Sequence, residues 1–426
     1  MLTRNVSYLI LLTLLLAIST PIFATGQGGP VVNDPSLKAQ VVYKGLDFPT
    51  SMAFLEVDDI LVLEKEKGTV NRIVNGQNSE APLLDVSVAS NGERGMLGIA
   101  VSSDNNDDMN NSQYVFLYYT ESAINNDGNG TKMEEEPLGN RIYRYILDDD
   151  YLKEDMLLLD LPAASSSNVT PFHNGGRIVV GPDRNIYAVI GDLNSRRTQA
   201  QNIQDGPEPD GTSTIYRIDQ DGAPVGGNPF EDIENLDKSY AYGIRNSFGM
   251  DFDPVTGNLW NTENGPDYGD EINLVEPGFN SGALYVYGMS SRKENFDPEK
   301  LVDFEGKGKY SDPEFSWEIP VGVTALQFLD SDKYGEEYQN DMFVGDVNNG
   351  NLYHFELNED RDGLSLTDDL EDKIAETAEE LGDVIFAQGF GGITDIEVGP
   401  DGYLYVLAIN RFQEDNAGTI YRIVPV

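Results

Sequence analysis

The sequence predicts an all-β fold, a six-bladed β-propeller, from three observations. One strand-turn-strand pattern recurs from Pro49 to the C-terminus, and it occurs six times. Within each strand apolar and polar residues alternate, which is the spacing of a half-buried sheet. The repeats also usually end in Tyr-Arg-Ile or a similar triplet. Self-similar units of roughly 40 to 50 residues with turns between them are typical of propeller blades.

The six copies follow one another along the chain. Each begins with an apolar strand, continues through a turn rich in Gly, Pro, Asp and Asn, and returns in a second strand. A β-sandwich is the alternative because it also has short alternating strands, but it does not repeat one strand-turn-strand sequence pattern six times. We therefore expect residues 40–426 to form one propeller. The copies start at Pro49, Arg94, Gly176, Asn246, Val323 and Ile393.

The N-terminal segment predicts export. Arg4 precedes an apolar run over 6–18, and Ala24 and several glycines follow. This order of basic, apolar and small residues is typical of a secretory signal peptide. The run is shorter than the roughly 20 residues that a membrane-spanning helix needs. We expect 1–24 to be a signal peptide, 25–39 to be a flexible segment, and the mature protein to be secreted or extracytoplasmic without a membrane span.

The composition excludes several classes of function. The formal net charge is -45 at pH 7, so nucleic acids and anionic membrane surfaces are repelled. The chain has no cysteine, which excludes thiolate metal sites and cysteine nucleophiles. Two explanations of the acidity stay open, namely adaptation to a saline environment and binding of divalent cations.

One of the two histidines is a candidate for proton chemistry. His173 stands before a glycine pair in HNGGRIVVGPD, at the edge of the third repeat. Imidazole is the side chain that exchanges a proton near neutral pH. The alternative for His173 is a structural role at the end of a strand. His354 lies within the predicted strand NLYHFEL, and we expect it to be structural.

A series of motifs gives the chain a resemblance to a known family. GERGMLGIA, HNGGRIVVGPD, YGIRNSFGMDF, ENGPDYGDEINLV and GPDGYLYVL follow in this order. From about Gly45 onward they resemble the glucose/sorbosone dehydrogenase family, the soluble sugar dehydrogenases that depend on pyrroloquinoline quinone. The resemblance implies a six-bladed propeller, quinone and calcium as cofactors, a small-molecule sugar as substrate, and a separate electron acceptor.

The resemblance implies a catalytic role for three residues. His173 matches the family's base, which takes the proton of the C1 hydroxyl while hydride leaves C1 for the quinone. Asp192 matches the aspartate that orients this histidine. Arg245 matches the arginine that faces the quinone carbonyls, where a permanent positive charge stabilises the reduced cofactor. The alternative for Arg245 is a salt bridge between blades.

The same resemblance places Glu93, Arg245, Asn246 and Asn264 at the quinone. Glu93 stands where some members of the family have glutamine. These positions come from three separate motifs, so only the folded chain can bring them together.

The resemblance also implies calcium ligands. Gly265 and Pro266 match backbone carbonyl ligands of the calcium that polarises the quinone, and such oxygens suit a hard cation. Asp270 and Glu271 match acidic residues at a neighbouring structural calcium. The alternative for this segment is an ordinary turn, since it reads Asn-Gly-Pro-Asp.

The chain departs from the family where the quinone carboxylates are bound. The lysine of the well-known members falls on Asn348, and two arginines fall on Gly392 and Thr394. Asp346 and Asp395 stand beside these positions and would repel a tricarboxylate, as would Glu93. These replacements predict weaker quinone binding than in a typical member.

Three functions are consistent with the motifs. The leading one is an exported, quinone-dependent aldose dehydrogenase, an oxidoreductase acting on CH-OH groups that oxidises aldoses at C1. The second is a calcium-dependent, lactonase-like propeller hydrolase, which needs no cationic clamp for a quinone. The third is a noncatalytic propeller that binds a glycan or a protein.

Overall fold

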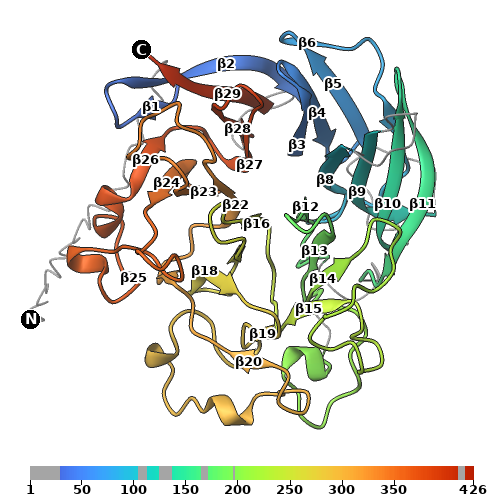
Figure 1. Cartoon of the computed structure of the whole chain (residues 1–426), viewed down its shortest axis with the longest axis vertical. Coiled ribbons are helices and arrows are strands. Elements are labelled where there is room, and N and C mark those ends of the chain that lie inside the picture. Colours follow the sequence, from blue (N-terminus) through green and yellow to red (C-terminus); the bar gives the residue numbers. More distant parts are fainter. Residues whose placement is uncertain (1–28, 104–112, 124–136, 165–170, 195–196, 411–417) are drawn as a thin grey trace, which may run out of the picture.

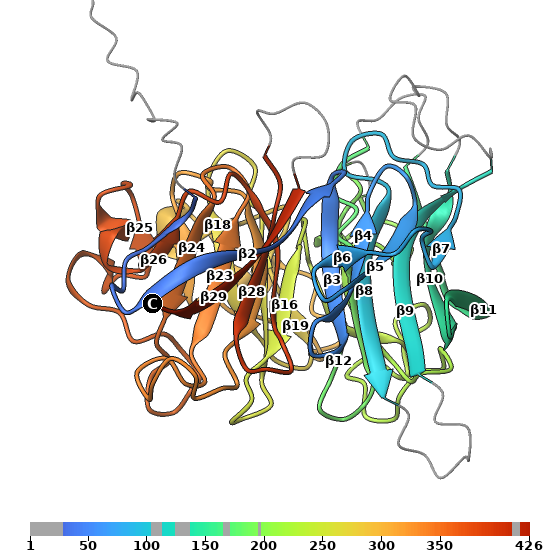
Figure 2. The same ribbon diagram turned by 90° about the horizontal axis from the view of Figure 1, so that it is seen from above.

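The computed structural model describes residues 29–103, 113–123, 137–164, 171–194, 197–410 and 418–426. Within these ranges the strands pair into six sheets, which surround a central axis (Figure 1). Figure 2 shows the ring from the side, with strands such as β3, β8 and β9 standing upright. The prediction of an all-β propeller is therefore confirmed.

Each of the first three sheets uses strands that are mostly consecutive in the chain. The first sheet contains β3 (Pro49–Glu56), β4 (Asp59–Glu64), β5 (Thr69–Val74), β6 (Gln77–Asn78) and β7 (Leu84–Asp85). The second contains β8 (Met96–Ser103), β9 (Gln113–Ser122), β10 (Pro137–Asp148) and β11 (Tyr151–Leu161). The third contains β12 (Ile178–Val180), β13 (Ile186–Ile190), β14 (Thr214–Ile218), β15 (Ser239–Tyr242), β19 (Phe279–Asn280) and β20 (Lys309–Tyr310).

The other three sheets complete the ring. The fourth contains β16 (Gly249–Phe252), β17 (Leu259–Glu263), β18 (Asp270–Val275), β21 (Phe315–Trp317) and β25 (Ile374–Ala375). The fifth contains β22 (Val323–Phe328), β23 (Met342–Asp346), β24 (Asn351–Phe355), β26 (Ile385–Gln388) and β1 (Val31–Val32). The sixth contains β27 (Ile393–Val398), β28 (Leu404–Ala408), β29 (Gly418–Pro425) and β2 (Leu37–Leu46).

The first strands of the sheets form the inner wall of the ring. β3 contacts β8, β8 contacts β12, β12 contacts β16, β16 contacts β22, β22 contacts β27, and β27 returns to β3. The ends of these strands therefore meet around the axis. Side chains from segments far apart in the sequence can converge there.

The two ends of the chain are joined within one sheet. β2, near the N-terminus, pairs antiparallel with β29, at the C-terminus. This pairing closes the ring without a disulfide, because a strand from near the N-terminus completes the sheet that holds the C-terminal strands. β1 also pairs with β26. The segment 25–39, expected to be flexible, thus contributes strand residues 31–32 and 37–39 to the sheets, because closure needs an N-terminal strand.

Two other expectations concern the N-terminal segment, namely a signal peptide and the lack of a membrane span in the mature protein. The predicted signal peptide 1–24 is outside the described residues. In the described ranges the helices are short 3₁₀ turns, and none is long and apolar enough to cross a membrane. They are η1 (Gln199–Gln201), η2 (Ser290–Arg292), η3 (Pro298–Lys300), η4 (Asp368–Leu370) and η5 (Glu380–Asp383).

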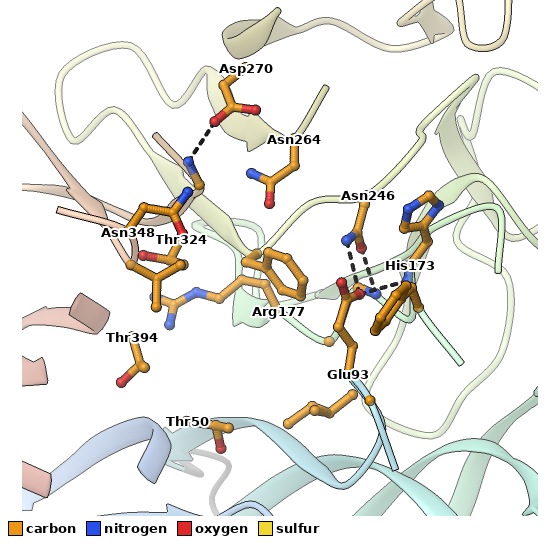
Figure 3. A pocket seen from close by; sticks show the side chains of 18 of the residues that line it. Thr50, Glu93, His173, Arg177, Asn246, Asn264, Asp270, Thr324, Asn348 and Thr394 are labelled. Carbon is orange, nitrogen blue, oxygen red and sulfur yellow. Dashed lines mark hydrogen bonds between the residues drawn. The ribbon is translucent and has the colours of Figure 1, made fainter. Parts of the chain in front are cut away.

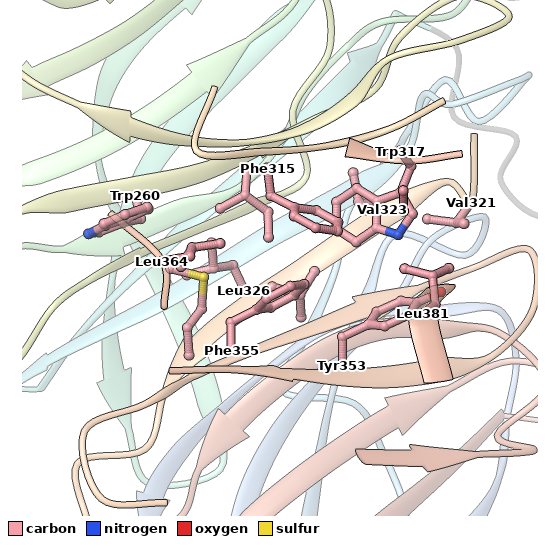
Figure 4. Packing of buried hydrophobic residues seen from close by; sticks show 14 of the residues in the cluster. Trp260, Phe315, Trp317, Val321, Val323, Leu326, Tyr353, Phe355, Leu364 and Leu381 are labelled. Carbon is pink, nitrogen blue, oxygen red and sulfur yellow. The ribbon is translucent and has the colours of Figure 1, made fainter. Parts of the chain in front are cut away.

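Apolar clusters join neighbouring sheets around the ring. Figure 4 shows the cluster between the fourth and fifth sheets, where Trp260, Phe315 and Trp317 face Tyr353 and Phe355. All five side chains are at most 2% exposed. Corresponding clusters join the other pairs of neighbouring sheets. Burial of these faces holds the sheets rigidly around the axis.

Candidate functional site

A cavity of about 590 Å³ lies at the centre of the ring. Its wall includes residues from the first strand of every sheet or from the segment just before it, so it lies on the axis. Figure 3 shows how these side chains converge. Six of them, each from the first strand of one sheet or from the segment just before it, are Thr50, Leu97, Arg177, Asn246, Thr324 and Thr394.

His173 lies in the wall of this cavity and is paired with Asp192. Its Nδ1 lies 2.6 Å from Oδ1 of Asp192, and both side chains are buried. Oδ1 also accepts a hydrogen bond from the backbone N-H of Asn194 at 2.7 Å. A carboxylate at Nδ1 keeps the proton on that nitrogen, which leaves Nε2 as the proton acceptor. The structure therefore brings together the pair that the sequence predicts.

Close backbone packing positions this pair. His173 has a φ of 62°, in the left-handed region, which is uncommon for a residue with a side chain and recurs at functional sites. Gly191 precedes Asp192, and a Cβ there would stand 2.3 Å from the carbonyl oxygen of Arg245 and 2.6 Å from that of His173. Only glycine lets these three segments approach so closely.

Glu93 connects the histidine loop to Asn246. Its Oε2 accepts hydrogen bonds from the backbone N-H of His173 at 2.6 Å and from Nδ2 of Asn246 at 3.0 Å (Figure 3). Oδ1 of Asn246 in turn accepts the N-H of Gly175 at 3.2 Å. Glu93, His173 and Asn246 all line the cavity. Three motifs that are separate in the sequence thus form one hydrogen-bonded wall.

Arg245 and Asn264 extend this wall. Nη1 of Arg245 donates to the carbonyl oxygen of Asn264 at 2.7 Å, and Nδ2 of Asn264 donates to that of Val323 at 2.7 Å. Among the described residues, no carboxylate lies within ion-pair distance of the Arg245 guanidinium, so the alternative of a salt bridge between blades does not describe this arginine. Arg245 is one of the residues that line the cavity.

The predicted calcium segment divides between two environments. Gly265, Pro266 and Asp270 line the cavity, whereas Glu271 does not. Oε1 of Glu271 instead accepts the backbone N-H of Gly288. The two carboxylates separate because successive residues of β18 point to opposite faces of the sheet. Burial raises the pKa of both carboxyl groups.

Asp270 holds the Gly265 turn in place. Its Oδ1 accepts the N-H of Gly265 at 2.9 Å and its Oδ2 accepts the N-H of Gly322 at 2.7 Å. A Cβ on Gly265 would stand 1.9 Å from the carbonyl oxygen of Tyr268, so the turn requires glycine. No group of three or more acidic or histidine side chains that could hold a metal occurs in the described part of the chain. A calcium ion here would depend on backbone carbonyls.

Two basic residues that sequence reasoning missed line the cavity, Lys65 and Arg177. Nη1 of Arg177 pairs with Oδ1 of Asp395 at 2.6 Å, and Nη2 pairs with Oε1 of Glu397 at 2.9 Å. Arg177 precedes the third sheet and Asp395 belongs to the sixth, so this pair spans the axis of the ring. Arg177 could have been noticed within HNGGR, but no local signal marks Lys65.

Asp346 and Asp395, which the sequence places where they would repel a quinone, are bound to other groups in the structure. Neither residue lines the cavity. Asp395 is paired with Arg177 and also accepts hydrogen bonds from Oγ of Ser51 and N-H of Met52, both at 2.8 Å. Asp346 is fully buried and accepts hydrogen bonds from its own strand-turn-strand unit. Of the three carboxylates considered, only Glu93 faces the cavity.

Asp346 should give stability a specific pH dependence. Burial raises the pKa of Asp346 from 3.8 to about 6, so the fold favours the neutral form. Its contribution is fully present below pH 3.8 and is lost as pH rises through about 6. Relative to wild type, Asp346→Asn should gain up to about 3 kcal/mol of unfolding free energy over this window.

Denaturant unfolding of both proteins between pH 4 and pH 7 measures this effect. Asp360→Asn, at an exposed position, controls for the change in net charge. Parallel pH profiles for wild type and Asp346→Asn would contradict the assignment.

His354 has the structural role that the sequence predicts. Its Nε2 lies 2.8 Å from Oδ2 of Asp341, and its ring packs against Phe343 and Phe386. It does not line the cavity. Only one of the two histidines thus reaches the axis.

The fold and the cavity define an all-β propeller with a histidine-aspartate pair on its axis. The chain belongs to the glucose/sorbosone dehydrogenase family, because the family model matches residues 46–422. A curated relative is the aldose sugar dehydrogenase of Escherichia coli K12, which is 26% identical over 401 residues, or 92% of this chain and 93% of the relative.

Solved structures have the same fold. An oxidoreductase of Thermus thermophilus, described as a glucose dehydrogenase, is 27% identical with a TM-score of 0.69, over 91% of this chain and 100% of that chain. A pyrroloquinoline quinone-bound aldose sugar dehydrogenase of Streptomyces coelicolor is 23% identical with a TM-score of 0.64, over 92% and 99% of the two chains. At that identity the second likeness concerns the fold alone.

Proposed function

We propose that this chain is an exported, quinone-dependent sugar dehydrogenase that oxidises aldoses at C1 with the help of calcium. The observation that carries the proposal is the His173–Asp192 pair in the central cavity of a member of this family. Family membership favours this function over the lactonase-like hydrolase and over the noncatalytic propeller.

The cavity suits an anionic quinone. Its volume of about 590 Å³ falls within the roughly 300 to 1,000 Å³ of small-molecule sites. Among its described lining residues, Lys65, Arg177 and Arg245 are basic, while Glu93 and Asp270 are acidic. Pyrroloquinoline quinone carries three carboxylates, which basic side chains stabilise. Arg245, Asn246 and Asn264 would hold its quinone end, and a calcium ion at Gly265 and Pro266 would polarise it.

The chain's own residues account for the proton chemistry. When bound, the quinone supplies the acceptor for the hydride that leaves C1 of the sugar. Nε2 of His173 accepts the proton of the C1 hydroxyl, and a cyclic aldose becomes a lactone. Asp192 holds the imidazole in the required tautomer and stabilises its protonated form. Arg245 stabilises negative charge that develops in the cavity.

Reconstitution tests the proposed function. We expect the purified chain with pyrroloquinoline quinone and calcium to reduce an artificial dye in the presence of an aldose, and to show a shift in the absorbance of the quinone. Hydrolysis of a lactone by the calcium-loaded protein, without dye reduction, would instead establish the hydrolase. If neither activity is detected, the noncatalytic binding propeller is the remaining function.

Calcium should stabilise the fold. A ligand that binds the folded state alone raises the melting temperature, and chelation lowers it. We expect a higher melting temperature in millimolar calcium than with a chelator, measured by calorimetry, with magnesium as the control cation. Gly265→Ala should weaken the response because its Cβ would displace the turn at Tyr268. Equal melting curves with calcium and chelator would overturn the calcium proposal.

We also propose that each of the six sheets is one blade and that residues 1–24 are removed on export. The closed order of contacts among the first strands supports the six-bladed architecture. The basic, apolar and small-residue order of the N-terminus supports the signal peptide. N-terminal sequencing of protein collected outside an expressing cell tests the cleavage, since an intact Met1 would contradict it.

A further inference from the structure

Arg177 follows His173 by four residues, and its guanidinium is bound on the other side of the axis. Nη1 pairs with Oδ1 of Asp395 at 2.6 Å, and Nη2 pairs with Oε1 of Glu397 at 2.9 Å. Nε donates to the carbonyl oxygen of Met250 at 3.4 Å. Figure 3 shows the Arg177 side chain extending away from His173. One side chain from the edge of the third sheet thus contacts β27 of the sixth sheet and β16 of the fourth.

Asp395, the main partner of Arg177, is itself held in place. Its Oδ2 accepts hydrogen bonds from Oγ of Ser51 and from the N-H of Met52, both at 2.8 Å and both on β3 of the first sheet. The side chains of Arg177 and Asp395 are 6% and 2% exposed. Water therefore screens this ion pair little, and loss of either partner would leave the other charge buried without compensation. The pair gives Arg177 a fixed point of attachment on the opposite side of the ring.

The segment between His173 and Arg177 has little room to rearrange. Gly175 and Gly176 have φ values of 63° and 124°, which favour glycine. A Cβ on Gly175 would stand 2.4 Å from the carbonyl oxygen of Val189, and the N-H of Gly176 donates to the same oxygen at 3.0 Å. Because the segment is short and tightly packed, a displacement of Arg177 would be transmitted along the backbone to His173.

We propose that Arg177 is a positioning residue for the base: its ion pairs across the axis hold the segment 173–177, and through it the His173 imidazole, against Asp192. The Nδ1 of His173 lies 2.6 Å from Oδ1 of Asp192, and a shift of about 1 Å in such a group can lower a rate by about a hundredfold. The catalytic consequence rests on the proposed function, whereas the position of the imidazole does not.

Nuclear magnetic resonance of the imidazole tests the inference without cofactor or sugar. The sequence has two histidines, so the untagged protein with isotope-labelled histidine gives two sets of ring signals. In wild type we expect Nδ1 of His173 to carry the proton, with a downfield resonance for its hydrogen bond to Asp192. In Arg177→Met this resonance should be lost, and the ring should shift toward the Nε2-H tautomer of free imidazole. The signals of His354 should not change.

Turnover gives the second measurement. We expect Arg177→Met to lower kcat of dye reduction roughly tenfold to hundredfold with little change in KM, since the position of the base matters in the transition state. Asp395→Asn breaks the ion pair from outside the cavity lining and should change kcat and the His173 signals in the same direction. Arg177→Lys keeps a cation but loses the planar fork, so it should recover part of kcat and of the resonance.

Arg361→Met is the matched control. Nε and Nη2 of Arg361 pair with the two carboxylate oxygens of Asp253 at 2.8 and 2.7 Å, and the Arg361 side chain is 16% exposed. This pair also joins two sheets, because Arg361 follows β24 of the fifth sheet and Asp253 follows β16 of the fourth. It lies outside the cavity lining. Arg361→Met should lower the melting temperature but leave kcat and the His173 resonance unchanged.

The outcomes separate this inference from the proposed function. The inference is wrong if folded Arg177→Met keeps the wild-type His173 signals, or if its kcat equals that of wild type. Equal loss of the resonance in Arg361→Met would attribute the effect to general loosening of the ring and overturn the inference as well. If Arg177→Met does not fold, Asp395→Asn and Arg177→Lys decide by the same signals. If wild type oxidises no aldose, the proposed function is wrong, but a changed resonance in Arg177→Met still establishes that Arg177 positions the imidazole.

Discussion

His173→Ala is expected to lower the turnover of aldose oxidation by roughly two to four orders of magnitude while the protein still folds. The substitution removes the base from the cavity wall, and no second histidine lies among its described lining residues. Asp192 would keep its hydrogen bond from the N-H of Asn194. Steady-state dye reduction measures the rate, and quinone binding by fluorescence shows that the cavity is intact.

His354→Ala is the control for this experiment. It removes the other histidine together with its contact to Asp341, outside the cavity, so turnover should not change. Wild-type rates in His173→Ala with every aldose tried would refute the assignment of the base. Global unfolding of His173→Ala would instead support the structural role at the end of a strand.

Asn348→Lys combined with Thr394→Arg is expected to tighten quinone binding by about a hundredfold or more in the presence of calcium. Both residues line the cavity, at the positions where the family has basic residues. Each new charge-assisted contact contributes about 1.5 to 3 kcal/mol, and about 1.4 kcal/mol corresponds to tenfold in Kd. Isothermal titration of the apoprotein with the quinone measures the change.

A double variant at the surface distinguishes the effect of local contacts on quinone Kd from the effect of net charge. Asn78→Lys with Thr367→Arg adds the same two charges at exposed positions and should leave Kd nearly unchanged at physiological salt, where exposed charges are screened. Equal tightening in both double variants would show that the acidic chain, with its net charge of -45, repels the quinone as a whole. In that case the affinity for the quinone carboxylates does not depend on contacts with the cavity wall.

The repeats were readable because their information is local. Alternating apolar residues and turn residues specify a strand, a turn and the next strand within a few tens of residues. The six copies seen from Pro49 onward correspond to the six sheets of the described structure. Closure of the ring was harder to predict from the sequence than the repeats were. The strand β2 that pairs with β29 has no turn in common with it, so the segment 25–39 was expected to be a flexible arm.

The candidate site was predictable to the extent that its residues lie in contiguous motifs. HNGGR carries His173, and GIRN carries Arg245 and Asn246. Their proximity follows once the repeats form a propeller, since each motif lies near the start of the first strand of a sheet. The pairing of His173 with Asp192 was expected from the resemblance, and the distance of 2.6 Å between Nδ1 and Oδ1 agrees with it.

The sequence by itself determined the propeller class, the candidate base His173 and the absence of basic residues at Asn348, Gly392 and Thr394. Only the tertiary structure decided which charges reach the axis. Arg177 lines the cavity, whereas Asp346 and Asp395 are held away from it by hydrogen bonds and by the Arg177 ion pair. The physical reason is that a side chain's electrostatic role depends on its partners and burial. Those partners come from sheets that are hundreds of residues apart in the chain, as in the contact of Arg177 with Asp395.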